Sequence, residues 1–226
     1  MHGYDWDYFP ARLHSTREII FFLEHIAKIE EVIEAHPSDL TRFIFGDIYH
    51  PRVKPHTMRF LAKKLDREID AVILEISTRK VMYYKNTPLN YYYATLSPNR
   101  DYTFVAKILT DEEIEYDVNR IIELCKSVFN ERIRIHIIPH LNLKTRVTND
   151  YVRDRAAFVN LLEQLSTKYP FKLHNIGRYL ENSNSDVFLE DYMPDGRHYA
   201  KTCEDTIKIF LAKTIYRQLP KLSTPA

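Results

Sequence analysis

Ala71-Val72-Ile73-Leu74-Glu75-Ile76 is the stretch that decides the fold of this 226-residue chain. All of its residues but the glutamate are apolar, and such runs are typical of strands in a parallel sheet that helices cover on both faces. A second strand pattern, residues 133–138, follows after a helical pattern. The sequence therefore predicts an α/β domain.

Helical and strand patterns alternate along the chain. Apolar spacing predicts helices over about 16–35, 55–65, 111–129, 150–168 and 199–216, and further strands at 42–47 and 171–174. Residues 77–104, rich in Tyr, Asn and Pro, are expected to form a long loop. Strands separated by helices favour a mostly parallel sheet. Residues 1–219 are predicted to be one domain, followed by a loose tail at 220–226.

The composition is that of an ordinary globular protein, with 45% apolar and 28% charged residues. The 32 basic and 31 acidic residues give a net charge of +1. This balance gives no electrostatic reason to expect nucleic acid or an anionic membrane as a partner.

The two cysteines, Cys125 and Cys203, lie on apolar stripes of predicted helices, which favours small buried side chains over a disulfide framework. No apolar run approaches the roughly 18 residues of a transmembrane helix, and residues 1–7 lack the pattern of a secretory signal. We therefore expect a cytoplasmic location.

The last predicted loop holds the strongest functional signal, Asp195-Gly196-Arg197-His198. In open α/β sheets, ligands bind at the carboxyl ends of the strands, where this loop is expected to lie. An aspartate three residues before a histidine can accept a hydrogen bond from the imidazole and stabilise its charged form. Gly196 permits a tight backbone between them. A simple turn or capping pair is the alternative interpretation.

The order of elements, with Asp195 and His198 just before the last helix, resembles the SGNH (GDSL-like) hydrolase family. In that family an Asp-x-x-His block supplies two members of a Ser-His-Asp triad. The chain is more similar to divergent SGNH-like domains of viral, algal and bacterial proteins, which often accompany glycan assembly. The resemblance implies a flavodoxin-like, three-layer α/β fold with a mostly parallel sheet. It rests on residues 13–20 (LHSTREII), 72–80 (VILEISTRK) and 195–199 (DGRHY).

Two blocks of the family pattern are absent. The chain has no strand followed by a Gly-Asp-Ser turn, and residues 75–78 stand where the family has Gly-x-Asn-Asp. Gly46 matches the single glycine that donates to the oxyanion hole. The missing first strand is the centre of the family's sheet, and without it neighbouring strands expose backbone groups. Residues 3–9 as a replacement strand, a partner chain and a fragmentary chain all remain open.

Ser77 is the candidate nucleophile or oxyanion donor, because it follows the strongest strand. Ser15 has capping-box spacing with Glu18, so a helix cap is favoured for it over a place in the site. His14 either approaches the site or packs against the domain. Glu75 is costly to bury unpaired, and Arg79 is its expected partner. That pair is either structural or a clamp for an anion or sugar hydroxyls.

Aromatic and amide side chains gather in the predicted 77–104 loop, a combination that suits sugar rings and also protein packing. They are Tyr83, Tyr84, Asn86, Asn90 and Tyr91–Tyr93. His140 and Asn142 follow the second strong strand and are placed among the substrate-lining residues. The four histidines at 136, 140, 174 and 198 match no ligand signature, so no metal is predicted. Without a Gly-rich loop, no nucleotide cofactor is predicted either.

Three functional hypotheses follow. The leading one is an enzyme that hydrolyses or transfers an ester or acyl group of a glycan, with His198 as general base and Asp195 orienting it. The second is a non-catalytic SGNH-like module that binds a glycan or a protein. The third is a glycan-modifying transferase that uses the same cleft without a triad.

Overall fold

A computed structural model of the protein describes residues 13–28, 69–90, 103–196 and 198–215. The predictions at 3–9, 42–47, 55–65, 91–93 and 220–226 lie outside these residues, and so does Gly46. The predicted helix at 16–35 is described only as far as residue 28, as α1 (Thr16–His25) and the 3₁₀ turn η1 (Ile26–Lys28).

A three-stranded parallel sheet runs through the described part of the chain. Its order is β1-β5-β6, formed by β1 (Ala71–Ile76), β5 (Arg134–Pro139) and β6 (Lys172–Leu173). The register pairs Ala71 with Arg134 and Ile76 with Pro139. The predicted parallel sheet of an α/β fold is confirmed.

Two long helices connect these strands, as the apolar spacing predicted. α6 (Asp111–Val128) lies between β1 and β5 in the chain, and α7 (Arg153–Lys168) lies between β5 and β6. Both α1 and α6 begin with a capping box, from Ser15 and Thr110, which satisfies the first free amides of each helix. The predicted start of α7 at 150 is wrong, because an isolated β-bridge to Lys144 holds Tyr151 in extended conformation.

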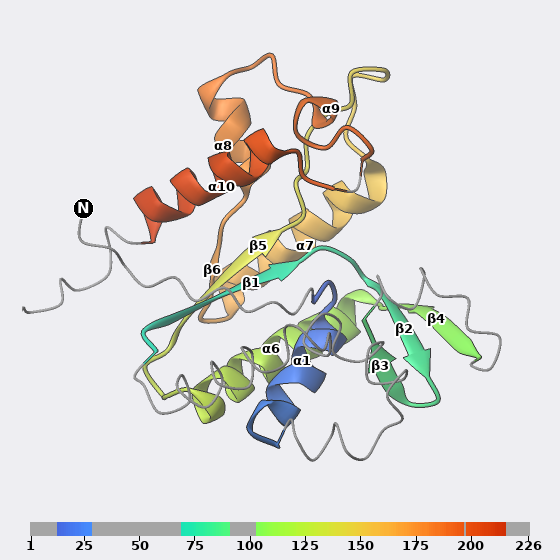
Figure 1. The fold of residues 1–226 in the computed structure, drawn as a ribbon, viewed down its shortest axis with the longest axis vertical. Coiled ribbons are helices and arrows are strands. Elements are labelled where there is room, and N and C mark those ends of the chain that lie inside the picture. Colours follow the sequence, from blue (N-terminus) through green and yellow to red (C-terminus); the bar gives the residue numbers. More distant parts are fainter. Residues whose placement is uncertain (1–12, 29–68, 91–102, 197, 216–226) are drawn as a thin grey trace, which may run out of the picture.

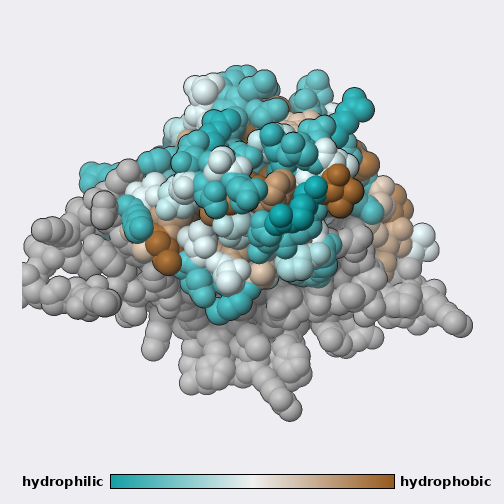
Figure 2. Space-filling view, turned by 90° about the horizontal axis from the view of Figure 1, so that it is seen from above, coloured by the Kyte–Doolittle hydropathy of each residue, from teal (hydrophilic) through white to brown (hydrophobic). Residues whose placement is uncertain are grey.

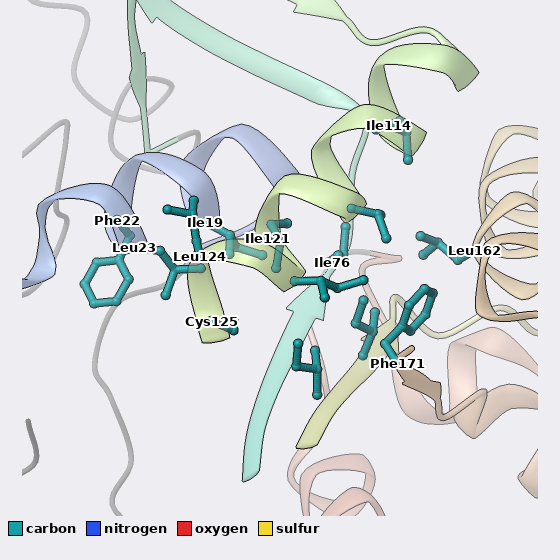
Figure 3. Close-up of a cluster of buried hydrophobic side chains, with 14 of the residues drawn as sticks. Ile19, Phe22, Leu23, Ile76, Ile114, Ile121, Leu124, Cys125, Leu162 and Phe171 are labelled. Atoms are coloured by element: carbon teal, nitrogen blue, oxygen red, sulfur yellow. The ribbon is translucent and has the colours of Figure 1, made fainter. Parts of the chain in front are cut away.

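Helices pack against both faces of the sheet (Figure 1). On one face, α1, α6 and α7 pack on Val72, Leu74, Ile76, Ile135 and Ile137. Figure 3 shows this cluster, in which Ile19 and Phe22 of α1 and Ile121 and Cys125 of α6 gather beside Ile76. Alternate residues of the strands serve opposite faces, which is the period-two geometry of a strand.

The other face packs against the C-terminal elements. These are α8 (Ile176–Ser183), the short α9 (Leu189–Tyr192) and α10 (Lys201–Thr214). Ile73 and Ile138 contact a second cluster that includes Leu180, Cys203 and Leu211. Both cysteines are buried and unpaired, as expected. α8 and α9 are absent from the predicted elements, because both helices are short and carry few apolar residues.

The predicted loop at 77–104 is wrong, because part of this segment forms strands. β2 (Lys80–Tyr84), β3 (Thr87–Leu89) and β4 (Phe104–Ile108) make a separate antiparallel sheet in the order β3-β2-β4. Tyr84 pairs with Thr87 across a two-residue turn, in which Lys85 adopts φ 54°. Val81 and Leu89 are fully buried. The aromatic residues that suggested a loop are also good strand formers.

None of the helices in the described ranges combines the length and the apolar character that a membrane crossing requires.

Candidate functional site

The carboxyl ends of β1 and β5, with the loops that follow them, carry most of the candidate residues. Ser77 follows β1, and His140 and Asn142 follow β5. The loop between α9 and α10, which holds Asp195 and His198, is joined to the end of β5 by Arg155. This is the edge at which ligands bind in open parallel sheets.

Asp195 and His198 form the predicted pair. Asp195 Oδ2 lies 2.5 Å from His198 Nδ1, and Asp195 Oδ1 accepts the His198 backbone N–H at 2.7 Å. The carboxylate therefore fixes both the backbone and the ring of the histidine. Gly196 permits this turn with φ 69°, and its N–H donates to the Met193 carbonyl. The His198 side chain is 68% exposed, so a ligand can reach the ring.

Arg155, at the start of α7, fastens this turn to the sheet. Its guanidinium donates to the Leu141 carbonyl at 2.9 Å and to the Gly196 carbonyl at 3.0 Å. Burial lowers the pKa of Arg155, since its partners are neutral carbonyls that only partly replace water. Sequence reasoning missed this residue because an arginine in the first turn of an amphipathic helix normally indicates a solvated face.

Glu75 pairs with Tyr199 rather than with Arg79. The Tyr199 hydroxyl donates to Glu75 Oε1 at 3.2 Å, and the edge of the His140 ring faces the Tyr199 ring at 5.5 Å between centroids. Glu75 keeps an exposed surface, yet surrounding protein atoms desolvate its carboxyl and raise its pKa. Burial, followed by the charge of Glu75, raises the pKa of Tyr199 well above its ordinary value. Tyr199 was missed as a site residue.

The predicted Glu75–Arg79 pair is wrong because the two side chains lie on opposite faces. Glu75 alternates with Ile76 and faces the α10 side, whereas Arg79 stands over the Phe158 ring of α7 at 5.4 Å. Arg79 pairs with Asp111 at 2.6 Å, at the start of α6. Arg79 therefore serves the helix layer on the other face.

Ser77 lies beside His14 and not beside His198. Ser77 Oγ is 3.2 Å from His14 Nδ1, and the His14 carbonyl accepts the backbone N–H groups of Ser77 and Thr78 at 2.9 and 3.1 Å. Ser15 is fully buried as the α1 cap, in agreement with the favoured interpretation. Among the residues that the structure describes, no hydroxyl lies within hydrogen-bond distance of the His198 ring.

Asn142 sits against the start of α8. A Cβ on Gly177 would lie 2.2 Å from the Asn142 carbonyl oxygen, so only glycine permits this approach. The Asn142 side-chain oxygen is buried and has no hydrogen-bond partner within the described ranges. Tyr83 and Tyr84 lie on β2, where they pack against the core instead of lining the edge with His198.

A buried histidine pair lies under α10. His136 Nδ1 is 2.8 Å from His174 Nε2, and the rings stack at 5.1 Å between centroids. Burial, together with the nearby charge of Lys172, lowers the pKa of each histidine to about 4. Both are therefore neutral near pH 7 and act as packed core residues.

The described residues form no candidate metal centre. They contain no group of three or more His, Cys, Asp or Glu side chains arranged to hold a metal ion.

Comparison with protein-family models, with curated proteins and with solved structures finds no match for this chain.

Proposed function

We propose that this chain is an SGNH-like domain that acts on an ester or acyl group of a glycan, by hydrolysis or by transfer to a hydroxyl. The observation that carries the proposal is the 2.5 Å contact between Asp195 Oδ2 and His198 Nδ1 on an exposed loop at the carboxyl edge of a parallel sheet. A carboxylate on Nδ1 leaves Nε2 to exchange a proton with a substrate.

In the proposed reaction, His198 Nε2 removes a proton from an attacking hydroxyl, whose oxygen forms a bond to the acyl carbon. The tetrahedral intermediate then expels the sugar alkoxide, which takes the proton back from the imidazolium. Asp195 holds the ring orientation and stabilises the positive charge. The attacking hydroxyl belongs to water in hydrolysis and to an acceptor sugar in transfer.

Ser77 enters the proposal through His14. A serine hydroxyl 3.2 Å from an imidazole nitrogen is a nucleophile–base arrangement. We infer that the same reaction can run through Ser77, whose oxygen bonds to the acyl carbon as its proton passes to His14 and then to the departing sugar alkoxide. A water or acceptor hydroxyl then gives its proton to His14 and displaces Ser77, which takes that proton back. Glu75 lies at the same edge, and burial raises the pKa of its carboxyl, which favours the protonated form.

The proposal also includes a specific fold, the flavodoxin-like sheet of SGNH type. β1 has the apolar sequence of a central strand, yet it lies at the edge of the described parallel sheet and most of its apolar residues are only half-buried. A further strand beside β1 would complete a flavodoxin-like sheet of SGNH type. That strand would come from this chain or from a partner chain.

Short acyl esters and acetylated oligosaccharides test the activity. We expect hydrolysis by the unaltered protein and a loss of at least about 100-fold with His198→Ala, the usual effect of removing a general base. Asp195→Asn should lower activity as well. Asp205→Asn is the matched control, because Asp205 is an exposed carboxylate on α10 that pairs only with lysines. Equal activity in all variants would remove His198 from catalysis.

A non-catalytic binding module is the second candidate. It is favoured by the lack of a described hydroxyl beside the His198 ring. Glycan binding without any ester turnover, unchanged by Ser77→Ala and His198→Ala, would support this candidate.

A further inference from the structure

A separate pocket lies beside the candidate edge, between the loop after β5 and the loop that joins α8 to α9. Its volume is about 260 Å³. Its lining combines two aromatic rings and one aliphatic side chain with four polar side chains, namely Tyr151, Phe188, Val187, Lys144, Asn149, Glu181 and Ser185. None of these residues belongs to the Asp195–His198 or Ser77–His14 pairs.

The pocket is held by specific contacts. The Tyr151 hydroxyl donates to Glu181 Oε1 at 2.6 Å, which ties the β5–α7 loop to α8. A β-bridge holds Lys144 beside Tyr151 within the β5–α7 loop. The Lys144 carbonyl also accepts the Leu189 N–H at 2.8 Å, which ties this loop to α9. These contacts join three segments, so the walls are fixed before a ligand arrives, and less ordering is needed on binding.

The charges of the lining select a class of ligand. Lys144 Nζ lies 5.9 Å from the Tyr151 ring centroid, and within the described ranges it forms no ion pair. Glu181 supplies one negative charge to the lining, where it accepts the hydrogen bond from Tyr151. The two side chains carry opposite charges, so Glu181 repels an anionic ligand and Lys144 repels a cationic ligand. A neutral ligand with hydroxyl groups that both donate and accept satisfies both side chains.

Shape and aromatic content narrow the class further. The volume lies just below the range of about 300–1,000 Å³ that is usual for drug-sized ligands, which suits a single ring. Tyr151 offers an apolar face to the C–H groups of a sugar ring, while the amide of Asn149 and the hydroxyl of Ser185 suit its hydroxyls. Seen from the side of α8 and α10, the described surface is largely hydrophilic (Figure 2).

We propose that this pocket binds one neutral sugar unit. The inference deepens the proposed function, because the pocket would hold the sugar of a glycan whose acyl group reacts at the neighbouring edge. The loop after β5 contributes to the His198 turn and to the pocket. The Leu141 carbonyl accepts a hydrogen bond from Arg155, which also holds the His198 turn, and Lys144 lines the pocket. Sugar binding itself requires no catalysis.

Ligand-observed NMR on the full chain tests the pocket. The probes are D-glucose, D-galactose, D-mannose and N-acetylglucosamine, with D-glucuronate and D-glucosamine as charged counterparts. We expect saturation transfer to at least one neutral sugar, and weaker binding of both charged sugars. No transfer to any neutral sugar at millimolar concentration, or tighter binding of a charged one, would overturn the assignment.

Substitutions locate the binding. Glu181→Gln and Lys144→Met should each weaken sugar binding about tenfold, the effect of one lost charge-assisted hydrogen bond. The matched controls are Tyr169→Phe and Glu115→Gln, because the Tyr169 hydroxyl donates to Glu115 at 2.8 Å in a similar pair away from the pocket. Lys144→Met leaves the Tyr151–Glu181 bond in place, so it tests the pocket even if Glu181→Gln unfolds the protein. Unchanged binding in Lys144→Met would refute the site.

The two proposals fail separately. His198→Ala should lose ester turnover and keep sugar binding. Sugar binding without turnover in the unaltered protein would leave the pocket standing and remove the proposed activity, whereas turnover without sugar binding would do the reverse.

Discussion

Arg155 donates to the Gly196 carbonyl at 3.0 Å from the first turn of α7, and it thereby holds the turn that presents His198. The same guanidinium donates to the Leu141 carbonyl at the end of β5. One side chain thus sets the position of the Asp195–His198 loop relative to the sheet.

Replacing Arg155 with methionine should free this loop. Two buried carbonyl groups lose their donors, so we expect the free energy of unfolding to fall by about 1–3 kcal/mol. Amide hydrogen exchange should quicken across residues 193–199. Arg178→Met is the control, since its exposed pair with Glu163 is worth less than about 1 kcal/mol. Unchanged exchange in Arg155→Met would contradict the assigned role.

The contribution of Glu75 to the free energy of unfolding should fall as pH rises. Its pKa is raised in the folded state, so the folded protein binds more protons than the unfolded chain above the ordinary value of 4.5. The stabilisation is complete below that value and is lost as pH climbs through the raised pKa. Glu75→Gln removes this dependence, so the difference in free energy of unfolding between the two proteins, measured by urea denaturation, should shift in favour of Glu75→Gln as pH rises above 4.5. A constant difference would show that the pKa is not raised.

The His136–His174 pair should make the fold sensitive to acid. Both pKa values fall to about 4 from 6.5, so the unfolded chain binds more protons between these limits. The contribution of the two histidines to the free energy of unfolding is fully present above pH 6.5 and is lost as pH falls toward 4. The loss is at most on the order of 3 kcal/mol per histidine. His136→Phe should flatten the denaturation profile between pH 4 and 6.5. An unchanged slope in His136→Phe would contradict the role of this pair.

Two glycines should differ in their response to alanine for different physical reasons. Gly177→Ala forces a Cβ against the Asn142 carbonyl, a clash with backbone that should cost about 3 kcal/mol or more. Gly196→Ala meets no atom within 4 Å but keeps φ 69°, which costs about 1–2 kcal/mol. Thermal denaturation of both variants tests this order, and a larger loss for Gly196→Ala would contradict it.

The sequence predicted those parts of the fold that have strong local periodicity. β1, β5 and α6 were placed within one or two residues, because their apolar runs are long and α6 carries its own cap. The β2–β4 pairing was missed because it connects residues 80–84 with 104–108, a contact that no local pattern reveals. The β2–β3 hairpin is local, but its Tyr, Asn and Pro content suggested a loop. The Asp195–His198 contact was predicted because it spans three residues.

Other contacts of the site were beyond sequence reasoning for the same reason. The Tyr199–Glu75 bond joins residues 124 positions apart, and Arg155 reaches Gly196 over 41 positions. Ser77 was correctly placed at the end of β1, but its neighbour His14 comes from a segment 63 residues earlier. Distance along the chain, rather than weak chemistry, hid these partners.

The single carbonyl of His14 has a consequence for the order of folding. It accepts two amides, from Ser77 and Thr78, so the end of β1 is completed by a residue that enters across a long closed loop. Closing such a loop costs entropy before any contact repays it, and contacts of this kind form slowly. The hairpin of β2 and β3 needs no such closure. We therefore expect the β2–β3 hairpin to form early and the end of β1 to be completed late, so that a refolding chain gains hairpin structure before Ser77 and Thr78 bind the His14 carbonyl.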